Sequence, residues 1–381
     1  MLGTTLLWYF PSKCKVGARG FRESSRFREV SPQSRRAGPP RRHAVILLIT
    51  PLLLSMVRPR IVVWFRSDLR LHDNPLLAQC LANKGEKEVL PCYIFDERVF
   101  GPTTALGNEK TGAYRAKFIT ESVMDLRSRL RNIGSDLFVG IGKPEELLPK
   151  LASEHQPGSS VKGGPSTLFL SQQHVTSEEL RVDKAVRRAL PAGTALLKTM
   201  PSGSLYARED MPFRLDLVDM PDVFTPFRNK VEAKCTVPSP LAPPPKGSLP
   251  LPSADTLPTP SETFGFDAMP SEKALGLPPG SLSAPPDPRG VLPFQGGETA
   301  ALARLKHYIW DGDCLKDYFE TRNGMLGPDY SSKFAPWLAQ GCLSPRTVAQ
   351  ECARYEEQRV KNKSTYWLIF ELIWCEVLNH E

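Results

Sequence analysis

Short apolar runs alternate with amphipathic stretches between residues 61 and 200. Five runs have the length and composition of buried strands: "IVVWF", "EVLPCYIFD", "DLFVGIG", "TLFLSQQ" and "ALLKTM". Between them, apolar residues recur at helical spacing near 74–83, 111–132, 144–154 and 177–190. Strands that alternate with helices are typical of a parallel sheet covered on both faces. The pattern therefore predicts an α/β domain over 58–200, with a five-stranded, parallel, doubly wound sheet.

The pattern changes after residue 200. Residues 201–237 show no clear period and are expected to be an irregular connection, and residues 238–293 hold 16 of the chain's 37 prolines. Proline removes a backbone donor, so the whole stretch 201–294 is predicted to be a connector without regular structure. From Glu298 onward Leu302, Leu305 and Ile309 share a helical face. Helices are expected to begin near Lys333, Ser344 and Thr365, which makes 295–381 a partial all-helical domain.

The net charge of +8 belongs to the first 57 residues, which carry ten Lys/Arg and two Glu. The rest of the chain has 39 residues of each sign, so the basic balance is poor evidence for a DNA-binding face. The leader is Arg-rich and poor in acids, like a transit peptide to mitochondrion or chloroplast. Alternatively Met56 is the usual start and the protein is cytoplasmic or nuclear. The run "AVILLITPLLLSMV" is too short to span a bilayer comfortably, and no membrane partner is expected.

The eight cysteines lie singly and the six histidines form no ligand pattern. No C-x-x-C pair is present, so the sequence predicts neither a zinc site nor a disulfide framework.

The segment "WFRSDLRLHDNP" directly follows the first predicted strand. No G-x-G-x-x-G or P-loop follows any strand, so an ordinary dinucleotide fingerprint is absent. Arg66, Asp68 and Arg70 alternate in charge where the strand ends. They predict either an ion-paired turn or a set of groups at the ligand-binding edge of the sheet.

Glu121 is the notable acid near the middle of a predicted helix that starts at about Thr111. It is either a solvated helical residue or a carboxylate at a pocket rim. In the second case it would accept hydrogen bonds from an amino-pteridine edge.

The segment "YFETRNGMLGPDYSSKFAPWLAQGCLSPR" places Ser331, Ser332 and Lys333 before a short predicted helix. Hydroxyls, free backbone N–H groups and a lysine at a helix start are typical of a phosphate cradle. The alternative is that one serine merely caps the helix.

The segment "FELIW" places Glu371 between Trp367 and Trp374 on one helical face. Burying a carboxylate costs several kcal/mol unless it is hydrogen-bonded or neutral. Glu371 is therefore either paired with an arginine at an interface or a polar handle in a pocket that stacks flat, aromatic ligands.

Together these segments resemble the cryptochrome/photolyase family and, within it, the cryptochrome DASH branch. The similarity covers about 58–374. It rests on five segments in order: "WFRSDLRLHDNP", "KTGAYRAKFITESVMDLR", "DMPDVFTPFRNKVEAKC", "ETRNGMLGPDYSSKFAPWLAQGCLSPR" and "STYWLIFELIW". The resemblance implies an α/β antenna domain joined by a long connector to a helical FAD-binding domain.

The resemblance also implies a function. Members of the family are blue-light flavoproteins, and the photolyases among them split cyclobutane pyrimidine dimers. The implied cofactors are FAD and a 5,10-methenyltetrahydrofolate antenna. DASH members favour single-stranded damaged DNA, which spares them the cost of opening a duplex. The alternative is a non-catalytic isoform that binds a folate, a nucleotide or a protein partner through its α/β domain.

The site residues are implied position by position. Glu371 and Trp374 match the lesion-contacting acid and tryptophan, and Glu121 matches the acid that holds the folate. The residues that match the FAD site are Tyr318, Ser331, Ser332, Lys333 and Phe334.

The sequence departs from the family pattern at two places. Ala335 stands where the family usually has Ser, which removes one hydrogen bond to FAD. Cys375 replaces the expected Arg, and "CEVLNHE" follows before the sequence stops. We expect a chain truncated within the FAD-binding domain, weak retention of FAD, and an open apolar face over 365–378 that favours self-association or a protein partner.

Overall fold

The computed structural model describes residues 59–83, 86–100, 109–152, 166–214, 217–325 and 327–378. The predicted leader, 1–57, lies outside these ranges. All the described residues belong to one compact unit.

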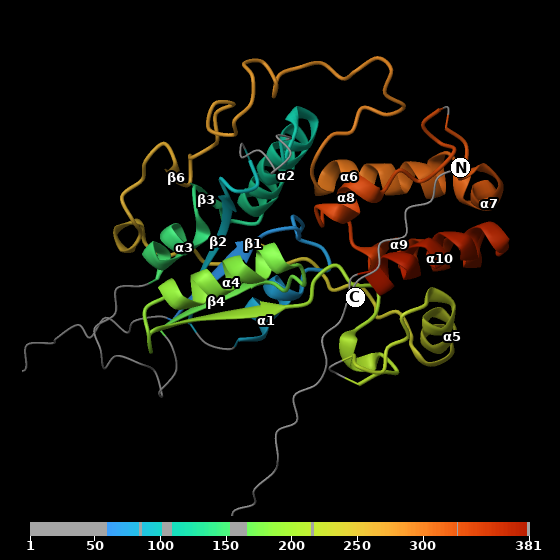
Figure 1. Ribbon diagram of the computed structural model, residues 1–381, viewed down its shortest axis with the longest axis horizontal. Helices are drawn as coiled ribbons and strands as arrows, with labels where there is room; N and C mark the ends of the chain where they lie inside the picture. The colour runs from blue at the N-terminus through green and yellow to red at the C-terminus, as the bar shows by residue number, and fades with distance from the viewer. Residues whose placement is uncertain are drawn as a thin grey trace, which may run out of the picture. The chain divides into compact units, whose positions relative to one another are not determined.

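A mixed sheet forms the centre of the N-terminal half (Figure 1). Its strand order is β5-β4-β1-β2-β3-β6. The five expected strands are confirmed and all run parallel: β1 (Arg60–Phe65), β2 (Glu88–Phe95), β3 (Phe138–Ile141), β4 (Thr167–Gln172) and β5 (Ala195–Met200). The predicted strand count is wrong by one, because the Pro-rich connector adds a two-residue antiparallel strand, β6 (Phe264–Gly265), beside β3. The order reverses between β1 and β4, which makes that position the topological switch point.

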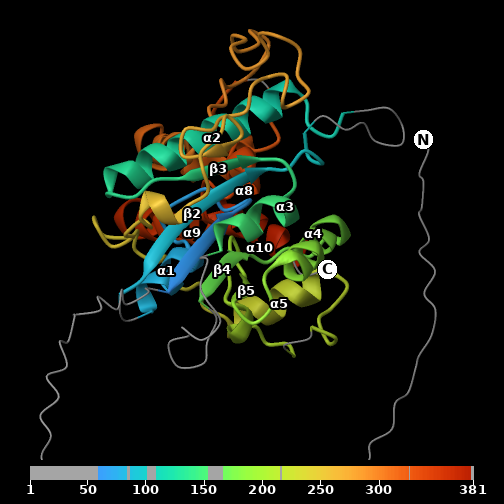
Figure 2. The same ribbon diagram turned by 90° about the vertical axis from the view of Figure 1, so that its left-hand side faces the viewer.

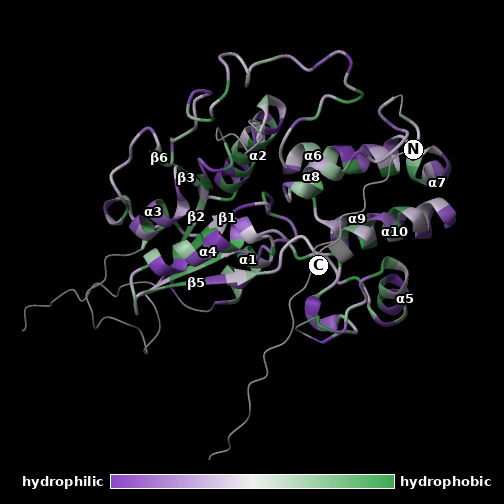
Figure 3. Ribbon diagram, viewed as in Figure 1, coloured by the Kyte–Doolittle hydropathy of each residue, from purple (hydrophilic) through white to green (hydrophobic). Residues whose placement is uncertain are grey.

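Helices cover both faces of the sheet, as Figure 2 shows from the side. On one face lie α1 (Pro75–Ala82) and α2 (Ala113–Asn132), and the opposite face carries α3 (Pro144–Leu147), the 3₁₀ turn Leu148–Leu151 and α4 (Ser177–Ala189). Asn74 starts α1, because its side chain accepts hydrogen bonds from two free N–H groups of the first turn. Figure 3 shows hydrophilic residues along α4, whereas the strand residues are largely buried.

The connector is more ordered than the sequence predicts. The short 3₁₀ turns Arg208–Asp210 and Ala254–Thr256 interrupt it, and α5 (Phe224–Lys234) is a helix of 11 residues. The irregular connection expected over 201–237 is therefore wrong for α5. Pro226 falls in the first turn of α5, where no intrahelical donor is lost. Phe224 and Phe227 are buried and anchor the helix.

The C-terminal part is helical, as predicted. Its elements are α6 (Glu298–Lys306), a π-helical turn (His307–Asp311), the 3₁₀ turn Cys314–Asp317, α7 (Tyr318–Thr321), α8 (Ala335–Ala339), α9 (Pro345–Gln358) and α10 (Lys363–Leu378). The last three begin within two residues of the expected starts. Helix α10 packs against α7, α9 and α5. The apolar core of these helices is continuous with the sheet face that α1 and α2 cover.

A buried carboxylate at the start of α6 joins the helical part to the sheet. Glu298 is fully buried and accepts hydrogen bonds from the backbone N–H of Leu71 at 2.7 Å and from His72 Nδ1 at 2.6 Å. Arg129 of α2 donates to the same group at 2.9 Å. Burial alone raises a carboxyl pKa, but His72 and Arg129 together hold the pKa of Glu298 below its ordinary value.

The turn after α8 approaches the sheet closely. Gly341 has φ +63, and a Cβ there would lie 2.1 Å from the carbonyl oxygen of Ser67. The carbonyl of Gly341 accepts a hydrogen bond of 3.0 Å from Arg70. Only glycine allows both the left-handed backbone and this contact.

Candidate functional site

The charged turn after β1 is held both by bonds within the turn and by bonds to distant segments. Arg66 donates to Asp183 of α4 at 2.8 Å, and Arg70 donates to backbone carbonyls. Asp68 is fully buried and accepts the backbone N–H of Arg66 at 2.8 Å. Burial raises the pKa of Asp68 to about 6, against the lowering effect of that hydrogen bond. The turn therefore both orders the loop and brings Arg66 to the carboxyl edge of the sheet.

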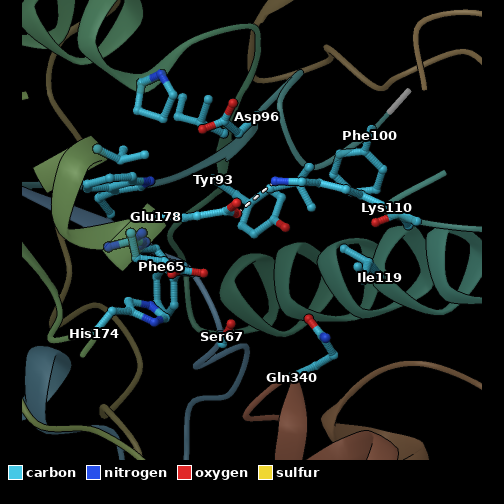
Figure 4. Close-up of a pocket in the computed structure, with 18 of the residues that line it drawn as sticks. Phe65, Ser67, Tyr93, Asp96, Phe100, Lys110, Ile119, His174, Glu178 and Gln340 are labelled. Atoms are coloured by element: carbon cyan, nitrogen blue, oxygen red, sulfur yellow. Dashed lines mark hydrogen bonds and ion pairs between the residues drawn. The ribbon is translucent and has the colours of Figure 1, made fainter. Parts of the chain in front are cut away.

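A cavity of about 340 Å³ opens at this edge, and Arg66 is among its lining residues. Its walls come from the ends of β1 and β2 and from α2 and α4, as Figure 4 shows. Its apolar lining includes Trp64, Tyr93, Phe100 and Ile119. This volume lies within the range of small-molecule sites, which are mostly apolar with a few convergent polar groups.

The polar groups of this cavity are incompletely paired. Lys110 and Glu178 form an ion pair of 2.7 Å across it (Figure 4). Three lining residues keep buried polar atoms without a partner among the described residues: Thr111 Oγ1, His174 Nε2 and Glu179 Oε2. Burial, and secondarily the charge of Arg66, lowers the pKa of His174 to about 3, so its ring is neutral at pH 7. Buried polar atoms without partners are uncommon and indicate a place where a ligand can supply the missing bonds.

Glu121 lies outside this cavity. Its Oε2 accepts the backbone N–H of Gly296 at 2.8 Å, at the end of the connector. A Cβ on Gly296 would lie 2.0 Å from the carbonyl oxygen of Phe118, so α2 and the connector are in direct contact here. One oxygen of Glu121 is therefore used to fix the connector, and the residue is half-buried rather than fully solvated.

Two of the residues expected around FAD meet in one aromatic cluster. Tyr318 of α7 and Phe334 both contact the ring of Tyr308, with centroids 6.3 and 5.8 Å apart. All three rings are buried. The hydroxyl of Tyr308 is buried without a partner in the described part of the chain. Burial raises the pKa of Tyr318 to about 12, so its phenol is protonated at pH 7.

Ser331, Ser332 and Lys333 lie together just before α8 and are half-buried. Lys333 has φ +59, a left-handed backbone that is uncommon for lysine. None of the described cavities is lined by these residues. Adjacent N–H groups near a left-handed residue suit an anion, and Phe334, which follows them directly, contacts the buried ring of Tyr308. The residues present therefore fit the phosphate and aromatic parts of a flavin nucleotide.

Glu371 on α10 has partners within the chain. Trp367 Nε1 donates to its Oε1 at 2.9 Å, and Arg322 Nε lies 3.6 Å from the same oxygen. Arg322 also stacks over the Trp367 ring at 4.8 Å. The arginine partner that one reading of the sequence expected is thus present, and the carboxylate remains partly exposed.

Trp374 lies one turn further along α10 and is 41% exposed. Its ring stacks on Phe224 of α5, with centroids 3.6 Å apart and planes at 8°. Phe224 also contacts Phe370 edge-on at 5.2 Å. The aromatic face expected on this helix is therefore covered in part by α5, the helix that the sequence did not predict.

Three residues that belong to these sites were missed in the sequence. His174 follows β4 with no motif around it, although its place after a strand was a usable signal. Tyr308 and Arg304 read as ordinary residues of an amphipathic helix. In the folded chain Tyr308 contacts Phe334, and Arg304 donates hydrogen bonds to the backbone of 328–332.

Comparison with known proteins agrees with this fold. The family model for DNA photolyase matches residues 61–246. The chain is 44% identical over 339 residues to "Cryptochrome DASH, chloroplastic/mitochondrial" of Ostreococcus tauri, covering 84% of this chain and 59% of that protein. It is 43% identical over 314 residues to cryptochrome DASH of Gloeobacter violaceus, with 82% and 57% covered. The crystal structure of a Synechocystis cryptochrome superposes with a TM-score of 0.69 at 40% identity, covering 85% of this chain and 61% of that one.

An α/β sheet domain followed by packed helices, with these relatives, defines a photolyase-type protein. The chain resembles the cryptochrome/photolyase family, and relatives at 42–44% identity to it are named cryptochrome DASH. This family implies FAD binding and often a folate antenna. The chain spans somewhat under two thirds of the length of these relatives.

The names of the relatives give different subcellular locations. Those of Ostreococcus tauri and Arabidopsis thaliana are named chloroplastic/mitochondrial, and the bacterial one is not. Within the described residues, no helix combines the length and apolar character needed to cross a bilayer.

Proposed function

We propose that this chain supplies the phosphate-binding side of the flavin site of a DASH-type blue-light photoreceptor and photolyase. One observation carries the proposal: Tyr318 and Phe334 meet around Tyr308, directly beside the half-buried donors of 331–333. Bound FAD supplies light-driven one-electron chemistry. The chain's own residues bind and orient the cofactor and exclude water from one side of it.

The proposed roles follow from chemistry. The hydroxyls of Ser331 and Ser332 donate hydrogen bonds to phosphate, and Lys333 adds a positive charge. Phe334 and Tyr318 provide buried aromatic surface. Ala335 lacks the hydroxyl that the family usually has there, so it provides no further bond.

The proposed lesion contacts are on α10. Trp374 presents a partly exposed ring suited to stacking on a base. Glu371 offers a carboxylate already oriented by Trp367, which can accept a hydrogen bond from a base edge. Damaged or single-stranded DNA is thus the proposed partner, and the exposed part of this face is the proposed surface for self-association or a protein partner. Glu121 remains the proposed contact for a folate antenna.

The measurement that tests the flavin proposal is an absorption spectrum of the full purified chain, before and after denaturation, followed by titration with FAD. We expect flavin bands, or saturable binding of added FAD. Hydrogen bonds to charged groups are worth about 1.5–3 kcal/mol. A double variant, Ser331→Ala with Ser332→Ala, should therefore lose at least about tenfold in FAD affinity.

The matched control is Ser281→Ala with Ser283→Ala, two serines of the connector whose hydroxyls donate only to carbonyls three residues earlier. The control should bind FAD like the wild type. A folded chain with neither bound nor titratable flavin would refute the proposal.

A second candidate function rests on the cavity at the carboxyl edge of the sheet. Its orphaned polar atoms and aromatic wall support binding of a folate or nucleotide by the α/β domain without redox chemistry. A His174→Phe variant would remove the unpaired ring nitrogen from that cavity and leave 331–334 intact. If it loses the chromophore while the double serine variant keeps it, this second function is favoured.

A further inference from the structure

Arg304 is almost fully buried and holds the segment that precedes α8. Its side chain is 6% exposed. Its Nε donates to the carbonyl of Ser332 at 3.0 Å, and its Nη2 donates to the carbonyls of Pro328 and Ser331 at 2.8 and 3.2 Å. Its Nη1 donates to the carboxylate of Asp329 at 2.7 Å. One guanidinium thus binds four acceptors within five consecutive residues.

This arrangement fixes the direction of the backbone donors. In a trans peptide the C=O of one residue and the N–H of the next point in opposite directions. Because the carbonyls of Ser331 and Ser332 point at Arg304, the N–H groups of Ser332 and Lys333 point away from it. Neither N–H donates to another group of the described residues. The left-handed backbone at Lys333 suits a concave set of donors for an anion.

Further contacts hold the side chain of Arg304 in place. The Arg304 guanidinium lies over the ring of Tyr308 at 5.2 Å. Asp329 has a second partner, His307, at 3.2 Å. The side chain of Arg304 therefore has little freedom, and its charge is balanced by Asp329 rather than left for a ligand.

We propose that Arg304 is the positioning residue that turns the N–H groups of Ser332 and Lys333 outward to receive phosphate. The inference rests on the proposed flavin function and deepens it. Arg304 does not touch the ligand in this arrangement. It acts by holding the carbonyls on the opposite side of the same peptide groups.

The first test compares Arg304→Lys with a control, Arg354→Lys, in the full chain. Arg354 is an exposed arginine that also contacts an acid and an aromatic ring. Lysine keeps the charge but cannot reach four acceptors. Fluorescence titration should show about a tenfold loss of affinity for FAD in Arg304→Lys, with the affinity for riboflavin, which has no phosphate, changed less than about twofold. Equal FAD affinity in the two variants would overturn the proposal.

The second test needs no flavin. Hydrogen exchange of the amides in 327–334 is measured with and without inorganic pyrophosphate. In the wild type, pyrophosphate should slow exchange at residues 332 and 333. In Arg304→Lys, and more weakly in Asp329→Asn, basal exchange in this segment should rise and the pyrophosphate effect should vanish. Asp329→Asn serves if Arg304→Lys does not fold.

These outcomes separate the two ideas. If the wild type binds no FAD but pyrophosphate protects residues 332 and 333 in an Arg304-dependent way, the flavin proposal fails and the positioning role stands. If pyrophosphate protects nothing in the wild type, or if it protects both variants as it protects the wild type, the positioning role is refuted.

Discussion

The carboxylate of Glu298 should be one of the strongest single determinants of stability in this chain. Replacing it by glutamine keeps the size of the side chain but removes the negative charge that Arg129 and His72 face. Glu298 is fully buried, and the side chains of Arg129 and His72 are 28% and 12% exposed, so water can replace the lost interaction only in part. Breaking a buried pair in this way costs about 3–5 kcal/mol.

Because both partners keep some exposure, we expect the lower end, about 3 kcal/mol. At about 2–4 °C per kcal/mol for a protein of this size, Glu298→Gln should lower Tm by roughly 6–12 °C. The assay is thermal unfolding followed by circular dichroism. The matched control is Glu357→Gln, which changes an exposed glutamate of α9 and should leave Tm within about 2 °C.

The pH dependence gives a second, independent check. The folded pKa of Glu298 lies below its unfolded value, so its contribution is fully present above about pH 4.3 and is lost as the pH falls through the folded pKa. The Tm difference between wild type and Glu298→Gln should therefore shrink below about pH 4. A Tm for Glu298→Gln equal to that of the control at pH 7, or a difference that stays constant down to pH 3, would refute the reasoning.

Three further outcomes are expected. His174 has a folded pKa of about 3, below its unfolded value, so the wild type should lose about 2.5 kcal/mol more than His174→Gln between pH 7 and pH 4.5 in urea unfolding; equal losses would contradict this. Gly341→Ala meets both a positive φ and a backbone contact and should cost more than about 3 kcal/mol. Gly193→Ala, with φ +74 but open space around the new methyl group, should cost only about 1 kcal/mol. Equal Tm values for Gly341→Ala and Gly193→Ala would contradict this prediction, because the backbone contact at Gly341 would then add no cost. Trp374→Ala should destabilise by about 2 kcal/mol through loss of the stack on Phe224, whereas Trp374→Phe should recover at least half of that in the same assay.

The sequence predicted the parallel strands because each one is a buried apolar run followed by a helical stretch. It could not predict β6, since two residues in a Pro-rich segment have no period to detect. Helix α5 was missed because residues 201–237 show no clear helical period. Its Phe224 is placed instead by contacts with Phe370 and Trp374 of the distant helix α10. The local sequence pattern therefore predicted those elements that bury one regular face. It did not predict elements whose structure depends on contacts with residues distant in the sequence.

The same limit applies to the candidate site. The positions of Tyr318, Ser331 and Phe334 were found by resemblance, and the structure brings the two aromatic residues together. Arg304 was not singled out, because nothing in the neighbouring sequence indicates acceptors 24 to 28 positions away. For Glu371 the sequence left two alternatives, an arginine-paired residue or a polar group in a pocket. The structure gives it Arg322 as a partner and leaves its carboxylate partly exposed to solvent.

The two-residue strand β6 has a consequence for behaviour in solution. A sheet edge with unpaired N–H and C=O groups can recruit strands from other molecules and so seed aggregation. By pairing with Val139 and Gly140, β6 closes the outer side of β3, which is otherwise a short, buried and wholly apolar strand. The opposite edge strand, β5, exposes Lys198, and a charged side chain on an edge strand disfavours pairing with a strand of another molecule. The proline-rich connector therefore links the two halves of the chain and also covers a strand edge that could otherwise pair with another molecule.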